Sequence, residues 1–409
     1  MSEKGKAKFF YGYVVVAAAT VIFFTVWGGN RTFGIFLEPM LNEFGWTRAG
    51  ISGAYTFTML IMGVLGVFAG TLTDRFGPRV VLLGSACIMG LAFILISRVQ
   101  ALWQFYLFYG VILGVGMSGT FIPLMSAVVR WFVKRRALMS SMLTAGQAVG
   151  IVVLPPLFTL LISNYGWRVS YVILGGVTLA VIFLAGLAVK RDPGEMGMMP
   201  YGADESTTRH LDLQAAGLSL GEAVRTRQFW LLSTLSFADF FIINGIVVHI
   251  VIHAIGLGMA PTAAAGILSL AAGISIPARI IVGGIADKIG YRRALTICFS
   301  VAAAGLLLLQ IEDPWILYVF APLFGFSLWA SHSLIPPLMA ELFGLRSNAT
   351  ILAASVFIGS IGGALGPVVA GYIYDVTGGY ALAFLVFVAA AIIAVVSVLS
   401  LRPLLRDTG

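Results

Sequence analysis

The sequence predicts an all-α membrane protein of twelve transmembrane helices in two six-helix bundles, and three observations support this prediction. Hydrophobic residues make up 59% of the 409 residues and charged residues only 10%, whereas a soluble domain is about 25% charged. The mean hydropathy is +0.99. The apolar residues fall in runs of about twenty or more, each long enough to cross roughly 30 Å of hydrocarbon as a helix.

Twelve runs of this kind follow one another along the chain. Helices are expected because the lipid core offers no hydrogen-bond partners to an exposed backbone. The first run follows a short Lys-rich start and lacks the small-residue cleavage site of a signal peptide, so we expect it to be retained as the first span. The predicted spans are 11–37, 50–73, 80–98, 103–129, 137–163, 167–189, 228–256, 261–286, 293–311, 314–340, 348–374 and 378–401.

The basic residues are distributed unevenly between the two sides of the predicted membrane. With the N-terminus inside, twenty of the twenty-five Lys and Arg residues fall in cytoplasmic segments and three fall outside. This bias follows the positive-inside rule and places both termini in the cytoplasm. It also accounts for the net charge of +8, so we expect a lipid bilayer and not a nucleic acid as the partner.

The longest polar stretch divides the chain into two sets of six spans. We expect an N-terminal bundle over 1–190, a cytoplasmic linker over 191–227 with a short surface helix over 219–227, and a C-terminal bundle over 228–409. Features of the first half recur in the second at an offset of 213 residues, which indicates a duplication around a central substrate path. The aligned pairs include Gly70 with Gly283, Asp74 with Asp287, Gly77 with Gly290, Pro123 with Pro336 and Gly146 with Gly359.

Two motifs carry a resemblance to a known family. The segment "GTLTDRFGPR" (70–79) resembles the signature loop of the major facilitator superfamily, and "GGIADKIGYRR" (283–293) resembles its weaker second copy. The segment "RWFVKRRALMSSMLTAGQAVG" (130–150) is similar to the fifth-span motif of the monocarboxylate porter family. The resemblance implies transport of lactate or pyruvate with a proton, here across a bacterial cytoplasmic membrane. Ser275 stands where known members carry an aspartate, and Asn30 where they carry a lysine.

Arg279 is the strongest candidate for substrate binding, because it lies within an otherwise apolar run. Its guanidinium stays protonated, and an Arg in mid-span costs at least about 2.5–3.5 kcal/mol. It must therefore face the bundle interior or water, where its planar fork suits a carboxylate. The alternative interpretation is a structural ion pair with Asp239, which lies at a compatible depth in the seventh span.

Asp239 is the first candidate for the proton carrier, with a static counter-ion as the alternative. His249 and His332 can titrate near neutral pH, although a histidine in a helix is more often only a hydrogen-bonding residue. Asn30 and Asn244 are expected to bind substrate or to join helices. The substrate contacts expected are Arg279, Asn30, Asn244, His249, His332, Ser275 and Leu143, with Val26, Phe33, Phe121 and Leu143 as an apolar wall.

The two motif loops are interpreted as gates and not as substrate sites. Their charges are expected to join helix ends when the cytoplasmic side is shut and to separate when it opens. Lys134 and Arg135 are either similar latches or membrane anchors, and Arg136 is interpreted as an anchor. The expected gating residues are Asp74, Arg75, Arg79, Asp287, Lys288 and Arg292.

Other functions are disfavoured by the motifs. The segment "GVGMSG" (114–119) lies inside a span and has no preceding strand, so nucleotide binding is not expected. With Cys87 and Cys298 both inside spans, neither a disulfide framework nor a metal site is expected, and we expect no cofactor and no enzyme activity. The alternatives are an exchanger of dicarboxylates or oxalate-like and formate-like anions, with Arg31 as a second cation, and more remotely a membrane sensor.

Overall fold

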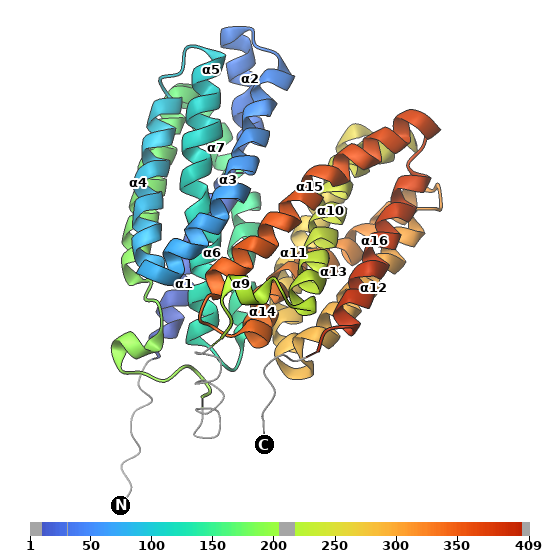
Figure 1. Ribbon diagram of the computed structural model, residues 1–409. Helices are drawn as coiled ribbons and strands as arrows, with labels where there is room; N and C mark the ends of the chain where they lie inside the picture. The colour runs from blue at the N-terminus through green and yellow to red at the C-terminus, as the bar shows by residue number, and fades with distance from the viewer. Residues whose placement is uncertain (1–9, 31, 204–216, 403–409) are drawn as a thin grey trace, which may run out of the picture.

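The computed structural model describes residues 10–30, 32–203 and 217–402, and the regular elements in these ranges are helices. Figure 1 shows them in two groups, one from α1 to α7 and one from α10 to α16, whose ribbons approach at one end and diverge at the other. The first group holds α1 (Gly12–Phe23), the π-helical η1 (Phe24–Gly28), α2 (Phe33–Phe44), α3 (Arg48–Phe76), α4 (Pro78–Ile96), α5 (Leu102–Phe105), the π-helical η2 (Tyr106–Leu113), α6 (Gly114–Trp131) and α7 (Arg136–Ala188).

The second group follows a connection that contains two short elements, the 3-10 turn η3 (Pro193–Met196) and α9 (Leu220–Ala223). Its helices are α10 (Arg227–Gly256), α11 (Pro261–Ile289), α12 (Tyr291–Leu308), α13 (Pro314–Ser331), the 3-10 turn η4 (His332–Leu334), α14 (Ile335–Phe343), α15 (Asn348–Thr377) and α16 (Ala381–Leu399).

Among the described residues, eleven helices are long and apolar enough to cross a membrane. One of them, α7, has 53 residues and turns at Gly166, where φ is 76° and ψ is 164°. Glycine adopts this left-handed region without the steric cost that a side chain would add. The turn separates the predicted fifth and sixth spans, so α7 contains both and the twelve predicted spans are accounted for.

The surface helix expected over 219–227 is wrong in length, because α9 ends at Ala223. Ser219 and Glu222 form a reciprocal capping box around this single turn. The backbone N–H and hydroxyl of Ser219 donate to the Glu222 carboxylate and lower the pKa of Glu222. Thr226 then starts a new helix, since its Oγ1 accepts from the backbone N–H of Phe229 at 3.2 Å.

The two groups meet where glycines allow helices to approach closely. A Cβ added to Gly70 in α3 would lie 2.7 Å from the carbonyl oxygen of Ala349 in α15. A Cβ added to Gly283 in α11 would lie 2.4 Å from Oγ of Ser141 in α7. These glycines are partners in the 213-residue repeat, so the same position brings α3 to α15 and α11 to α7.

Candidate functional site

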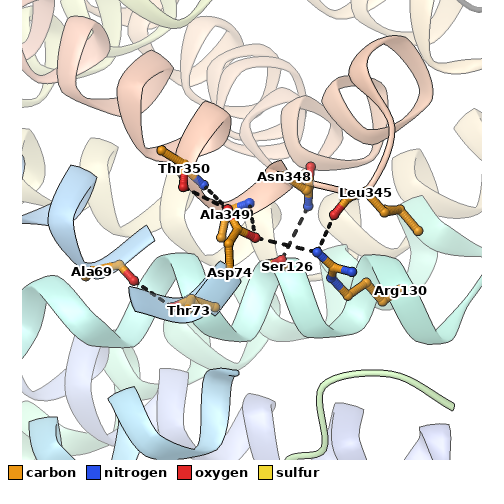
Figure 2. A network of polar contacts seen from close by, with 9 residues as sticks. All are labelled: Ala69, Thr73, Asp74, Ser126, Arg130, Leu345, Asn348, Ala349 and Thr350. Atoms are coloured by element: carbon orange, nitrogen blue, oxygen red, sulfur yellow. Dashed lines mark hydrogen bonds and ion pairs between the residues drawn. The ribbon is translucent and has the colours of Figure 1, made fainter. Parts of the chain in front are cut away.

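Asp74 joins α3 to the beginning of α15 (Figure 2). Its carboxylate accepts hydrogen bonds from the backbone N–H of Ala349 at 3.3 Å, from the backbone N–H of Thr350 at 2.9 Å and from the Thr350 hydroxyl at 2.8 Å. Arg130 in α6 lies 3.5 Å from the same carboxylate and also donates to the carbonyl oxygen of Leu345. A negative charge at a helix N-terminus is stabilised by the exposed N–H groups and the helix dipole.

Asp287 forms the matching contact between α11 and the beginning of α7. Its carboxylate oxygens accept from the backbone N–H groups of Ala137 and Leu138, both at 2.9 Å. Each repeat therefore supplies an aspartate that caps a helix of the other group. We call this end of the molecule the aspartate end, and these contacts hold it closed in this structure.

The other predicted gating residues have different surroundings. Arg75 and Lys288 are exposed, with the guanidinium of Arg75 5.1 Å from the centre of the Phe76 ring. Arg79 is also exposed, and Arg292 donates to the carbonyl oxygen of Leu399. These four cations are not the groups that bond the two aspartates in the contacts described above.

Arg136, interpreted from the sequence as a positive-inside anchor, does not lie at the surface. This residue is only 4% exposed, and its Nε donates to the carbonyl oxygens of Val129 and Phe132. These are carbonyls at the end of α6 and just after it, which the helix no longer satisfies. Arg136 therefore fixes the α6–α7 connection from inside.

Arg279 lies in α11 with 7% of its surface exposed. Its guanidinium donates to the carbonyl oxygen of Thr144 in α7, so the side chain crosses from one group of helices to the other. The expectation that this cation faces the protein interior is confirmed. Leu143, the neighbour of Thr144, is fully buried, while Ser275 bonds its own helix at the carbonyl oxygen of Ala272.

Asp239 in α10 is fully buried and has two polar neighbours on one segment. Ser331 Oγ donates to Asp239 Oδ1 at 3.0 Å, and His332 Nδ1 lies 3.1 Å from Asp239 Oδ2. The His332 side chain is 24% exposed. Its ring lies between Phe121 of α6 and Phe240 of α10, with centroids 5.8 and 5.1 Å away.

The Arg279 contact and the His332 segment are connected through α7. Thr144 Oγ1 donates to the carbonyl oxygen of Ser141 at 3.0 Å, and Ser141 Oγ lies 2.7 Å from Ser333 Oγ. Ser333 directly follows His332. Polar contacts thus lead from the buried Arg279 across the junction to Ser333, whose neighbour in the chain, His332, contacts the buried carboxylate of Asp239.

Several predicted substrate residues lie apart from this junction. Asn30 bonds Tyr55 OH at 3.0 Å and Met117 Sδ at 3.4 Å, within the first group. Val26 and Phe33 line a small cavity of that same group, together with Asn30. The other two residues of the expected apolar wall lie at the junction: the ring of Phe121 contacts that of His332, and Leu143 precedes Thr144 in the chain. Arg31 lies outside the described residues.

Asn244 and His249 are engaged within the second group. Asn244 Nδ2 donates to the carbonyl oxygen of Phe240 in the same helix at 2.9 Å. His249 Nδ1 lies 3.0 Å from Tyr380 OH, and Nε2 lies 2.9 Å from the carbonyl oxygen of Pro367. Both ring nitrogens of His249 therefore have protein partners, which suits a structural role.

Sequence reasoning missed the serines and Thr144, which carry the contacts between the charged residues. Small hydroxyl residues are common in membrane helices, and their partners depend on the rotation of each helix. The sequence indicated Asp239 and His332 as separate candidates at a similar depth in the membrane, but it did not predict their contact. In the described part of the chain there is no cluster of three or more His, Cys, Asp or Glu that could hold a metal ion.

The fold spans the membrane, buries charges where two helix groups meet and joins the groups by reciprocal contacts at one end. These features are those of a membrane transporter. The chain belongs to the Major Facilitator Superfamily, whose model matches residues 18–367 and 285–408. The predicted family and fold class are confirmed, and the protein is a multi-pass membrane transporter and not an enzyme. The sidedness of the termini stays a prediction.

Relatives cover most of this chain. Monocarboxylate transporter 13 of Bos taurus is 27% identical over 384 residues, covering 92% of this chain and 86% of the relative. Monocarboxylate transporter 11 of Mus musculus is 25% identical, covering 92% and 84%. The oxalate:formate antiporter of Oxalobacter formigenes is 25% identical over 374 residues, covering 86% and 84%.

Two solved structures share the fold at low sequence identity. The transporter FucP in the outward conformation has a TM-score of 0.76 and 13% identity, covering 95% of this chain and 98% of that chain. The proton:xylose symporter XylE has a TM-score of 0.77 and 13% identity, covering 94% of each.

Proposed function

We propose that this protein carries small monocarboxylates of the lactate or pyruvate type together with a proton, across the cytoplasmic membrane of a bacterium. The observation that carries the proposal is Arg279, a buried guanidinium that reaches from one helix group to the other. Charges inside membrane helices mark transport paths far more often than not. The relatives named as monocarboxylate transporters support an anionic substrate with one carboxylate.

The substrate carboxylate is proposed to take the place of the Thr144 carbonyl as the partner of Arg279. An ionised acceptor bonds a guanidinium about twice as strongly as a neutral carbonyl does. The exchange releases one contact between α11 and α7, so substrate binding acts directly on the junction of the two groups. The alkyl end of the substrate would meet Leu143 and Phe121.

Alternating access is proposed to follow from the state of the aspartate end. The positive-inside rule supports a cytoplasmic location of this end, and the structure would then correspond to the state that is closed to the cytoplasm. Separation of Asp74 from the start of α15, and of Asp287 from the start of α7, would open it. The four predicted gating cations would act at the same end; they are Arg75, Arg79, Lys288 and Arg292.

A proton is proposed to accompany the anion because of the membrane potential. Moving a lone anion against an inside-negative potential costs about 2.3 kcal/mol per 100 mV. One proton cancels this charge. The proton is proposed to be taken up at the cluster around Asp239, which lies at the junction and contains the titratable His332.

The second candidate is exchange of dicarboxylates or oxalate-like anions for smaller ones. The relative named as an oxalate:formate antiporter favours it. Such a substrate has two negative groups and requires a second cation, for which Arg31 is the candidate from the sequence.

Uptake of radiolabelled lactate into proteoliposomes tests these proposals. Symport predicts stimulation by an inward proton gradient, while exchange predicts dependence on an anion loaded inside. Arg279→Gln is expected to abolish uptake without loss of folded protein, and Arg279→Lys to retain a small part, since a lysine keeps the charge but lacks the fork. Arg225→Gln is the control, because Arg225 is exposed in the connection before α10. Uptake by Arg279→Gln at the level of this control would remove Arg279 from the site.

A further inference from the structure

Asp239 and His332 differ in their access to water. Asp239 is fully buried, whereas the His332 side chain is 24% exposed. The His332 side chain lies at the junction of the groups, because its ring packs against Phe121 of one group and Phe240 of the other. A proton that arrives through water therefore meets the imidazole before the carboxylate.

The hydrogen bonds decide which nitrogen is available. His332 Nδ1 faces Asp239 Oδ2 at 3.1 Å, while Ser331 Oγ donates to Asp239 Oδ1 at 3.0 Å. If Asp239 is an anion, it accepts from both neighbours, from Ser331 Oγ and from an N–H at His332 Nδ1. Nε2 is then the nitrogen with a lone pair, and a proton bound there produces an imidazolium beside a fixed carboxylate. Hydrolase triads use a buried Asp in this way to orient a His and stabilise its charged form.

We propose that the transported proton binds Nε2 of His332, and that Asp239 is a positioning residue that stays ionised through the cycle. This inference rests on the proposed function and names the proton-binding atom. It revises the sequence-based assignment of the proton to Asp239 itself. No covalent step is involved: the proton adds to the Nε2 lone pair and leaves from it.

The charges that surround the pair support this assignment. Arg279 on α11 is linked to the His332 segment through α7. On α12, the thiol of Cys298 is buried and lies close enough to Asp239 to interact with it electrostatically. The rings of Phe121 on α6 and Phe240 on α10 are uncharged. Glu341, further along in α14, interacts instead with Arg136 and Arg292.

The central charges are balanced in two states of the carrier. When it is empty, the charge of Arg279 cancels that of Asp239, and His332 is neutral. When it is loaded, the substrate anion adds one negative charge and the proton on His332 adds one positive charge, so the sum is again zero. A carrier with only the anion or only the proton holds a net charge in low-dielectric surroundings, which is unfavourable. The two balanced states are those that can change conformation, and this couples one proton to one monocarboxylate.

Two substitutions of His332 test the assignment, with His253→Gln as the matched control. His253 lies in the last turn of α10, where its ring packs against Tyr380 and Phe384. His332→Gln removes the proton-binding nitrogen, and His332→Lys replaces the imidazolium by a permanent cation. Lactate binding to purified protein near neutral pH is measured by calorimetry in buffers of different ionisation enthalpy, which counts the protons taken up.

We expect uptake of about one proton per lactate in the wild type and in His253→Gln, and of about zero in both His332 variants. Affinity is expected to fall about tenfold in His332→Gln but to stay near the wild-type value in His332→Lys, because only the lysine keeps the positive charge. A purely structural role predicts the opposite order, since lysine fits the histidine position less well. In proteoliposomes, both variants should take up lactate more slowly than the wild type, because one of their two states carries a net charge. The uptake that remains should not respond to a proton gradient and should become faster with an inside-positive potential.

Proton uptake of about one in His332→Gln, or uptake that still follows the proton gradient, overturns the assignment while the proposed function stands. A wild-type protein that neither binds nor transports lactate or pyruvate overturns the proposed function itself. The two failures are therefore distinguished by the wild-type measurement.

Discussion

Gly283 offers a direct test of how the two helix groups close against each other. A Cβ at this position would lie 2.4 Å from Ser141 Oγ, 2.9 Å from Ser141 Cβ and 2.9 Å from the carbonyl oxygen of Ala137. Rotation of Ser141 relieves only the first of these contacts, and it breaks the hydrogen bond from Ser141 to Ser333. The other two contacts involve the main chain and Cβ of α7, so Gly283→Ala must move α11 away from α7.

The size of the effect follows from these contacts. Overpacking by one methyl group costs about 1–3 kcal/mol, and the lost hydrogen bond adds about 0.5–1.5 kcal/mol if Ser141 rotates. The penalty acts in the conformation in which the aspartate end is closed, because there α11 touches α7. A bias of about 1–3 kcal/mol changes the ratio of two conformations about 5- to 150-fold. We therefore expect Gly283→Ala to favour the conformation that is open at this end.

Double electron–electron resonance measures the two populations. Spin labels replace Val80 and Arg293, which are exposed near the starts of α4 and α12, on different groups at the aspartate end, in a background without Cys87 and Cys298. Gly284→Ala is the matched control, since its added Cβ meets only Leu138 Cδ1 at 3.9 Å. Gly283→Ala should increase the longer-distance population, and a distance distribution equal to that of Gly284→Ala would refute the reasoning.

Two further substitutions test the electrostatic contacts. Asp74→Asn removes the charge that faces the start of α15 and should destabilise the closed end by about 0.5–2 kcal/mol. The same spin labels measure this change. An unchanged distance distribution would count against the Asp74 contact as a latch. Glu43→Gln removes the ion pair with Arg168, whose side chains are 40% and 39% exposed. Because solvent screens such a pair, we expect this substitution to lower the stability by less than about 1 kcal/mol. The unfolding temperature in detergent should therefore stay almost unchanged. A large drop in that temperature would show that the pair is structural.

The membrane fold could be predicted from the sequence, because it depends on properties that are local in the chain. An apolar run of sufficient length must form a helix in lipid whatever its neighbours are. A charge inside such a run must face inward, as Arg279 does. The repeated Gly and Asp of 70–74 and 283–287 also indicated equivalent helix ends, and the structure shows these ends bonded to the opposite group.

The partners of the polar residues were decided by the tertiary structure. Asn30 and His249 looked as suitable for substrate as His332 did, yet they bond within their own groups. Depth along a helix can be counted from the sequence, but the rotation of the helix and the choice of its neighbour cannot. The contact of Asp239 with His332 requires α10 and η4 to face each other across a distance of 93 residues in the chain.

The sequence by itself therefore determined that this chain crosses the membrane repeatedly and which rare charges lie inside it, since both follow from the cost of polar groups in hydrocarbon. Only the packing of helices distant in the chain decided which of those charges and hydroxyls meet, because hydrogen bonds require atoms within about 3 Å. Arg279 reached Thr144, and Asp239 reached His332, through contacts that no single segment specifies.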